Sequence, residues 1–303
     1  MNYLKMSGID VTVPQVALGC MRIAGVDPAR IARLIGTAVE CGVTFFDHAD
    51  IYGAGASEEA FAAAYTGRRE DIFIQTKCAI RPGVCYDFSK AHIVGSVEAS
   101  LRRLKTDYVD FLLLHRPDAL AEPEEVAAAF DELQSSGKVR WFGVSNHNPA
   151  QIELLTRYVK QPLLFNQLQF GIGHTEMIDA GINVNMHNDA GLCRDGSLID
   201  YCRLHDIRIQ AWAPFQYGFF EGFIFDRDKF PELNDILDRI GEREGVTPAA
   251  VAVAWISRHP AGIQTIVGTT DPDRLRGISK SSQFELTREE WYEIYRAAGH
   301  QLP

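Results

Sequence analysis

Eight short apolar runs recur along the chain, and amphipathic segments separate them. A short apolar run between polar segments is typical of a buried strand. Between the runs, apolar residues repeat at helical spacing, as at Ile93, Val97 and Leu101. The predicted strands are residues 16–20, 44–47, 72–77, 111–115, 141–145, 164–167, 207–212 and 264–268. The predicted helices are residues 28–40, 57–64, 89–104, 124–136 and 149–158.

This alternation of strands and helices predicts a parallel sheet, and eight parallel strands close naturally into a (β/α)₈ TIM barrel. A chain of 303 residues, 46% of them hydrophobic, suits this fold in a single domain. No repeat or low-complexity segment divides it, so we expect one domain over residues 1–303. Residues 3–13 resemble a hairpin that would plug one barrel end. Residues 170–197 are expected to form a long functional loop at the C-terminal face.

The charge balance argues against a polyanionic partner. The chain has 30 basic and 40 acidic residues, and its net charge of -10 disfavours binding to nucleic acid or anionic membranes. The first ten residues lack the apolar stretch of a signal peptide, and no segment approaches the ~20 apolar residues of a membrane span. The expected location is the cytoplasm, where the six scattered cysteines would be reduced. The sequence leaves the oligomeric state open.

Each predicted strand is apolar up to its carboxyl end, where a polar residue follows. Barrels of this kind carry their active sites at that end, so these residues should converge. Asp47, Lys77 and His115 occupy three such ends, and Tyr52 follows closely after Asp47. A phenol has a pKa of about 10 and donates its proton better when a cation such as Lys77 stabilises the phenolate. Asp47 would hold the ammonium, and His115 would orient a carbonyl oxygen.

Taken singly, each of these residues has an ordinary structural interpretation. Asp47 and Lys77 would suit a plain ion pair, and His115 would suit a hydrogen-bonded core histidine. Tyr52 alone would be a loop tyrosine. The joint pattern is what predicts a proton-transfer site.

Several segments resemble the motifs of the aldo-keto reductase family. Residues 46–53 read FDHADIYG, residues 76–77 read TK, and residues 114–118 read LHRPD. Residues 137–146, GKVRWFGVSN, are similar to the family's fifth-strand motif, and residues 166–167, NQ, to its sixth. The similarity runs in order from about residue 18 to residue 274. Within the family the chain looks most similar to bacterial oxidoreductases that carry DHADIYG.

The resemblance implies a reaction and a cofactor. We expect NADPH-dependent reduction of an aldehyde or ketone, with a small carbonyl compound as substrate and NAD(H) as the less favoured cofactor. The implied catalytic residues are Asp47, Tyr52, Lys77 and His115, with Tyr52 as the general acid. Ser145, Asn146 and Gln167 would hydrogen-bond the nicotinamide carboxamide, and Trp212 would stack on its ring. The implied nicotinamide residues also include Ala213, Pro214 and Phe215.

The chain departs from the family pattern where many members have a lysine for the 2′-phosphate of NADP. Gly268 occupies that position. Arg274 follows at the expected start of the eighth helix, one of the places where such barrels bind phosphate. A guanidinium can give a phosphate two hydrogen bonds, and Thr269 can add a hydroxyl donor. We therefore expect Gly268, Thr269 and Arg274 to lie at the phosphate, with NADPH preferred over NADH.

Other functions have weaker support. Gly53 and Gly55 are not followed by the third glycine of a Rossmann fingerprint. Ser145 is not followed by the final glycine of a hydrolase nucleophile elbow. The dispersed histidines do not predict a metal site. Two alternatives stay open: a Schiff-base aldolase through Lys77, or a cofactor-binding regulatory subunit with vestigial turnover. The aromatic residues expected near the site favour an apolar substrate; they are Phe170, Phe215, Phe219 and Phe220.

Overall fold

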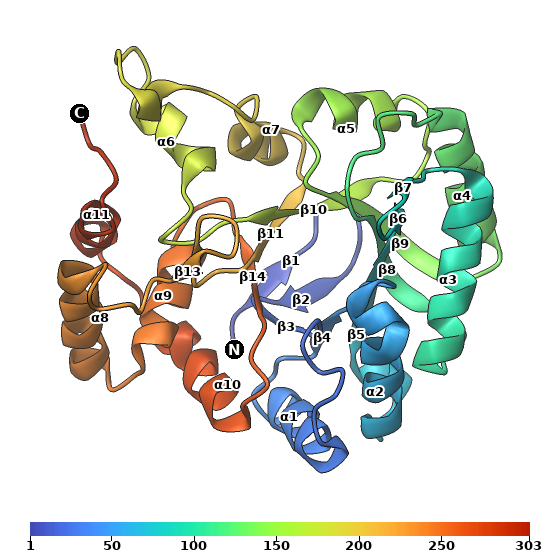
Figure 1. The fold of residues 1–303 in the computed structure, drawn as a ribbon, viewed down its shortest axis with the longest axis horizontal. Helices are drawn as coiled ribbons and strands as arrows, with labels where there is room; N and C mark the ends of the chain where they lie inside the picture. The colour runs from blue at the N-terminus through green and yellow to red at the C-terminus, as the bar shows by residue number, and fades with distance from the viewer.

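Eight parallel strands close into a barrel in the computed structural model, which describes residues 1–303 (Figure 1). The barrel strands are β3 (Val16–Gly19), β4 (Phe45–Asp47), β5 (Phe73–Cys78), β8 (Val109–Leu114), β9 (Val139–Ser145), β10 (Leu163–Gln169), β11 (Arg208–Trp212) and β14 (Gln264–Val267). Each pairs with the next in this order, and β14 pairs with β3 to close the ring. The predicted (β/α)₈ fold is confirmed, and every barrel strand overlaps a predicted apolar run.

Helices surround the barrel (Figure 1). Several begin at a side chain that caps the first turn: Asp27, Ser89 and Asn148 each accept a backbone N–H there. The five predicted helices all form, with ends shifted by two residues or fewer. No helix is both long enough and apolar enough to cross a bilayer. The helices are α1 (Pro28–Glu40), α2 (Ala56–Ala64), α3 (Lys90–Leu104), α4 (Pro123–Ser135), α5 (Pro149–Thr156), α6 (Glu176–Ile182), α7 (Leu198–Leu204), α8 (Pro231–Glu244), α9 (Pro248–Ser257), α10 (Pro272–Ser279) and α11 (Arg288–Ala297).

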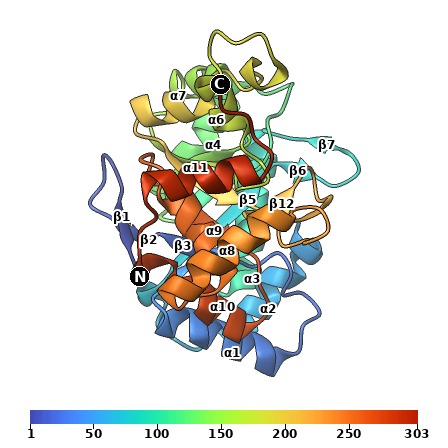
Figure 2. The ribbon, with the colours of Figure 1, turned by 90° about the vertical axis from the view of Figure 1, so that its left-hand side faces the viewer.

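The N-terminal segment closes one end of the barrel, as expected for residues 3–13. β1 (Tyr3–Lys5) pairs antiparallel with β2 (Thr12–Pro14). Met6 and Val13 are buried and belong to the same apolar cluster as the barrel interior. Two further hairpins, which the sequence did not predict, lie toward the opposite end (Figure 2). They are β6 (Ile80–Arg81) with β7 (Cys85–Tyr86), and β12 (Gln216–Tyr217) with β13 (Gly222–Phe223).

Strand alternation fills the barrel interior in layers. Residues two apart on a strand face the same side, so Phe73, Gln75 and Lys77 of β5 follow one another up the interior. The layer next to the plug is aromatic and contains Phe45, Phe111 and Phe165, with ring centroids 5.0 to 6.0 Å apart. Buried glutamines form the next layer, and Asp47 with Lys77 lies at the carboxyl end. Polarity therefore rises from the plug to the open end.

Residues 170–197 form a long excursion that includes α6, and its first residues pack behind Pro214 and Gln216, which line the carboxyl-end cavity described below. It packs against the end of the chain, where Tyr295 Oη donates to Asp179 Oδ1 at 2.7 Å. None of its residues lines that cavity. Phe170, which we expected near the site, is instead fully buried and stacks on Trp255 at 5.7 Å. The expectation of a functional loop therefore gains no support at this cavity.

Phe111→Ala tests the aromatic layer. The substitution removes a fully buried ring that packs on Phe45 and Phe165, and such changes cost roughly 3–5 kcal/mol. We expect a clearly lower denaturant midpoint when unfolding is followed by circular dichroism. Leu120→Ala, at a side chain that is 88% exposed, should stay within about 0.5 kcal/mol of wild type. Equal midpoints for the two variants would contradict close packing at Phe111.

Candidate active site

A cavity of 420 Å³ opens at the carboxyl end of the barrel strands. Although the predicted site residues are far apart in sequence, all but one of them line this cavity. They are Asp47, Tyr52, His115, Ser145, Asn146, Gln167, Trp212, Ala213, Pro214, Phe215, Gly268, Thr269 and Arg274. The exception is Lys77, which is fully buried behind the cavity wall. The barrel therefore brings the predicted catalytic, nicotinamide and phosphate residues to one place.

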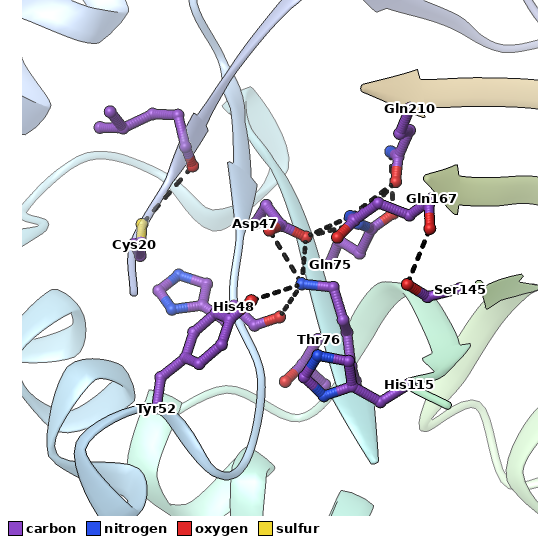
Figure 3. A network of polar contacts seen from close by, with 12 residues as sticks. Cys20, Asp47, His48, Tyr52, Gln75, Thr76, His115, Ser145, Gln167 and Gln210 are labelled. Carbon is purple, nitrogen blue, oxygen red and sulfur yellow. Dashed lines mark hydrogen bonds and ion pairs between the residues drawn. The ribbon is translucent and has the colours of Figure 1, made fainter. Parts of the chain in front are cut away.

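Lys77 and Asp47 form a buried ion pair at the base of the cavity (Figure 3). Lys77 Nζ lies 2.7 Å from Asp47 Oδ1 and 2.8 Å from Oδ2. It also donates to the His48 carbonyl at 2.8 Å and to Tyr52 Oη at 3.3 Å. An ammonium has three N–H groups, and these contacts engage all of them. The cation is therefore held beside the phenol oxygen.

Burial and charge act in opposite directions on the two titrating groups. Burial disfavours the Lys77 ammonium, but Asp47 and Tyr52 outweigh it, so the pKa of Lys77 lies above its ordinary value. Burial raises the pKa of the Tyr52 phenol, while Lys77 acts to lower it. Because burial wins, the pKa of Tyr52 lies above its ordinary value. The cation alone would lower the pKa of Tyr52; in the folded protein Lys77 only limits its rise, and Tyr52 keeps its proton near neutral pH.

His115 follows β8 and presents an uncharged ring to the cavity. Burial, with Lys77 and Arg116, lowers its pKa well below the ordinary value. Its ring lies 6.0 Å from that of Tyr52, at an interplanar angle of 84°. A neutral imidazole carries one N–H. His115 and Tyr52 can therefore both donate to a single oxygen atom in the cavity.

The turn that carries Tyr52 depends on a glycine. Gly53 and Ala54 adopt left-handed φ angles of 57° and 54°. A Cβ at Gly53 would lie 2.8 Å from the Ala24 Cβ, so a side chain there would force a shift. The backbone N–H of Tyr52 donates to the Ala49 carbonyl at 3.1 Å. This short turn holds the phenol over the end of β4.

The predicted nicotinamide residues form one hydrogen-bonded wall. Asn146 Nδ2 donates to Ser145 Oγ at 2.8 Å and to the His115 carbonyl at 3.3 Å. Asn146 Oδ1 accepts from Trp212 Nε1 at 3.1 Å. Ser145 Oγ donates to the backbone carbonyl of Gln167 at 2.8 Å. These bonds fix the side chains in place, which suits a wall that holds a planar ligand.

The predicted phosphate residues lie at the first turn of α10. Asp271 caps this helix, because its Oδ1 accepts the N–H groups of Asp273 at 2.9 Å and Arg274 at 3.0 Å. With these donors occupied, a phosphate would depend on the exposed Arg274 guanidinium and the Thr269 hydroxyl rather than on the helix end. Gly268 faces open space, since a Cβ there would meet nothing within 4 Å.

Some residues in and around the cavity were not predicted from the sequence. Gln75 and Gln210 lie within strands, where we expected only apolar residues, yet Gln75 Nε2 donates to Asp47 Oδ1 at 2.6 Å. The two-residue period from Lys77 back along β5 is the signal that points to Gln75. Arg30 of α1 lies near the predicted phosphate residues, where it donates to the Thr270 carbonyl. The cavity-lining residues that were not predicted are Gly19, Met21, Arg22, Ile51, Ile80, Arg116, Gln216, Phe223 and Ile266.

Comparison with known proteins identifies relatives over nearly the whole chain. The model of the Aldo/keto reductase family matches residues 15–298. The chain is 36% identical to the oxidoreductase YcsN of Bacillus subtilis, over 91% of this chain and 90% of that protein. It is 34% identical to the 6-dehydroglucose reductase of Agrobacterium fabrum, over 94% of each chain.

A solved structure supports the same relationship. The aldo-keto reductase from Klebsiella pneumoniae in complex with NADPH superposes with a TM-score of 0.79 at 25% identity, over 100% of this chain and 97% of that one. The fold, the family match and the identity to these relatives all agree. The chain therefore belongs to the aldo/keto reductase family and is an NAD(P)H-dependent oxidoreductase.

Proposed function

We propose that this enzyme uses NADPH to reduce the carbonyl of an aldehyde or ketone to an alcohol, with Tyr52 as the proton donor. One observation carries the proposal: the Lys77 ammonium, held by Asp47, lies 3.3 Å from the Tyr52 hydroxyl at the base of the cavity. Burying a charge is costly, so a buried ammonium beside a phenol indicates a function. We infer that Lys77 stabilises the phenolate that forms when Tyr52 gives up its proton.

Each catalytic residue has a separate role in the proposed reaction. His115 donates its N–H to the substrate oxygen and sets the orientation of the carbonyl. The nicotinamide, when bound, supplies the hydride that reduces the carbonyl carbon. As negative charge develops on the oxygen, Tyr52 transfers its proton there, and Lys77 stabilises the phenolate. Asp47 holds Lys77 in position throughout.

The cavity wall fits a nicotinamide carboxamide. Gln167 donates its two side-chain N–H groups to Asp47 and Gln210, each at 3.0 Å. Its Oε1 makes no hydrogen bond within the protein, so Gln167 would accept from the carboxamide NH₂. Asn146 and Trp212 stand beside it, and the indole offers a face for the ring. The related structure in complex with NADPH supports the cofactor assignment.

Aromatic side chains on the β12–β13 hairpin favour an apolar substrate. Phe219, Phe220 and Phe223 line the cavity and are exposed. Phe220 also stacks on Trp212, at 6.2 Å. Such a wall favours aromatic or long-chain aldehydes over sugars. Assays of NADPH oxidation with aldehydes, ketones and sugars, among them 6-dehydroglucose, would identify the substrate class.

The position of Lys77 disfavours the aldolase alternative. A Schiff base needs an unprotonated amine that reaches the substrate. Lys77 is fully buried, its N–H groups are all engaged, and its pKa is raised. No structural feature favours a regulatory subunit; slow turnover with every carbonyl, together with tight NADPH binding, would indicate one.

Tyr52→Phe tests the proton donor. The variant keeps the ring and loses the hydroxyl, so turnover should fall by about 100-fold or more, the usual contribution of general acid catalysis. The Kd for NADPH, measured by fluorescence titration, should stay near the wild-type value. Tyr86→Phe, on β7 outside the cavity lining, is the matched control and should keep full activity. More than about a tenth of the wild-type rate in Tyr52→Phe would exclude this role for Tyr52.

Lys77→Met tests the electrostatic coupling. Lys77 acts to lower the pKa of Tyr52, so its loss should raise that pKa. The reaction needs a protonated Tyr52, and the alkaline limb of the kcat profile should therefore move to higher pH while the overall rate falls. Steady-state rates measured across the alkaline range give the limb directly. An unchanged limb would count against the coupling.

Arg274→Ala tests the phosphate site. We expect the wild type to prefer NADPH over NADH by roughly 10-fold, equivalent to ~1.4 kcal/mol, and the variant to lose most of this preference while its NADH kinetics change little. Gly268→Lys, at a position with open space, should strengthen the preference. Equal losses with both cofactors in Arg274→Ala would make Arg274 structural. A wild type that prefers NADH would overturn the cofactor assignment.

A further inference from the structure

Four glutamines form a hydrogen-bonded network inside the barrel, between the aromatic layer and Asp47; three of them appear in Figure 3. Barrels of this kind mostly fill this space with branched apolar side chains. A buried amide is also costly unless its hydrogen bonds are made. The four residues are almost completely buried: Gln75, Gln167, Gln210 and Gln264. Their place under the ion pair indicates a role beyond packing.

The network joins the N-terminal plug to the ion pair. Gln75 Nε2 donates to Asp47 Oδ1 at 2.6 Å. Gln75 and Gln210 donate to each other, at 2.9 and 3.0 Å. Gln210 also donates to Gln264 Oε1 at 2.8 Å, and Gln264 donates to the Pro14 carbonyl at 2.7 Å. An unbroken line of amides therefore runs along the barrel interior.

Groups that only accept hydrogen bonds stand at both ends of this line, and they fix the amide orientations. A carboxylate and a backbone carbonyl have no N–H to offer. Gln75 must therefore turn its NH₂ toward Asp47, and Gln264 must turn its NH₂ toward Pro14. Gln210 satisfies both neighbours by donating to each of their oxygens. Turning any one of these amides over would place two oxygens or two NH₂ groups against each other. The network therefore keeps the NH₂ group of Gln75 directed at Asp47.

We propose that Gln75 and Gln210 are positioning residues for the proton donor, which rests on the function proposed above. They orient the Asp47 carboxylate and share its negative charge. Asp47 then holds Lys77 beside Tyr52 without cancelling the effect of the ammonium on the phenol. Neither glutamine lines the cavity. Gln75 acts on Asp47 directly, and Gln210 acts through Gln75 and Gln167, the two amides that donate to Asp47. Gln264 of β14 supports them through its bonds to Gln210 and to the Pro14 carbonyl of the plug.

The test is the alkaline limb of the kcat profile in glutamine variants. Gln75→Met removes a donor from Asp47, so more of the negative field of the carboxylate reaches Tyr52. The limb should move to higher pH by about half a unit, kcat at neutral pH should fall several-fold, and the KM for NADPH should not change. The shift should be smaller in Gln210→Met and smallest in Gln264→Met, because these residues lie farther from Asp47 along the line.

Gln75→Leu removes the amide donor with a shorter apolar side chain. Its limb should move in the same direction as in Gln75→Met, and it carries the test if Gln75→Met does not fold. The titratable groups that face Tyr52 are Lys77 from β5, Asp47 from β4, Cys20 after β3 and His115 after β8. None of them is substituted in these variants. The shift therefore reports the loss of the amide.

Two controls separate the explanations. Thr265→Val alters a buried hydroxyl that has no partner, beside Gln264 but outside the network, and should leave the limb unchanged. If Tyr52→Phe keeps its activity, the proposed function fails. If Tyr52→Phe is inactive but the Gln75 variants keep the wild-type limb, the positioning role alone is overturned. A fall in kcat by the same factor at every pH would show a merely structural network and would also overturn it.

Discussion

The buried ion pair between Asp47 and Lys77 is the interaction on which the rest of the site depends. Moving two charges out of water costs several kcal/mol for each ion, so such a pair persists only when its remaining hydrogen bonds are made. Here the carboxylate accepts two amide N–H groups besides the ammonium. The ammonium also donates to the His48 carbonyl and to Tyr52. Removing either partner would leave an unpaired charge next to the phenol.

The barrel explains how this pair can exist inside a protein core. Its interior changes from aromatic rings at the plug to amides and then to charges at the open end, and hydrogen bonds join the amides to Asp47 and to the plug. The two-residue period of the strands places these layers without any special turn or loop. Stability and chemistry therefore share one set of strands. The loops add what the strands cannot supply: the phenol of Tyr52, the aromatic wall of the β12–β13 hairpin and the proposed phosphate site near Arg274.

Much of this could be predicted from the sequence, because hydrophobic period and capping residues are local signals. Residues 28–40 form a helix with the predicted bounds, since Asp27 and a following proline mark its start. The convergence at the strand ends follows from the fold alone. The partners of Gln75 and Gln210 could not be predicted, because they depend on register between strands far apart in the chain. Nor could the direction of the Tyr52 pKa, because burial is a property of the folded state.

The most direct measurement of the central claim is the titration of Tyr52 itself. The Cζ signal of Tyr52 in protein labelled with ¹³C-tyrosine, assigned with Tyr52→Phe, reports ionisation of the phenol without any turnover. In the wild type it should titrate above the ordinary range of a tyrosine, because burial outweighs the cation. In Lys77→Met the midpoint should move higher still. The same midpoint in both proteins would show that Lys77 does not act on the phenol, and would contradict the account.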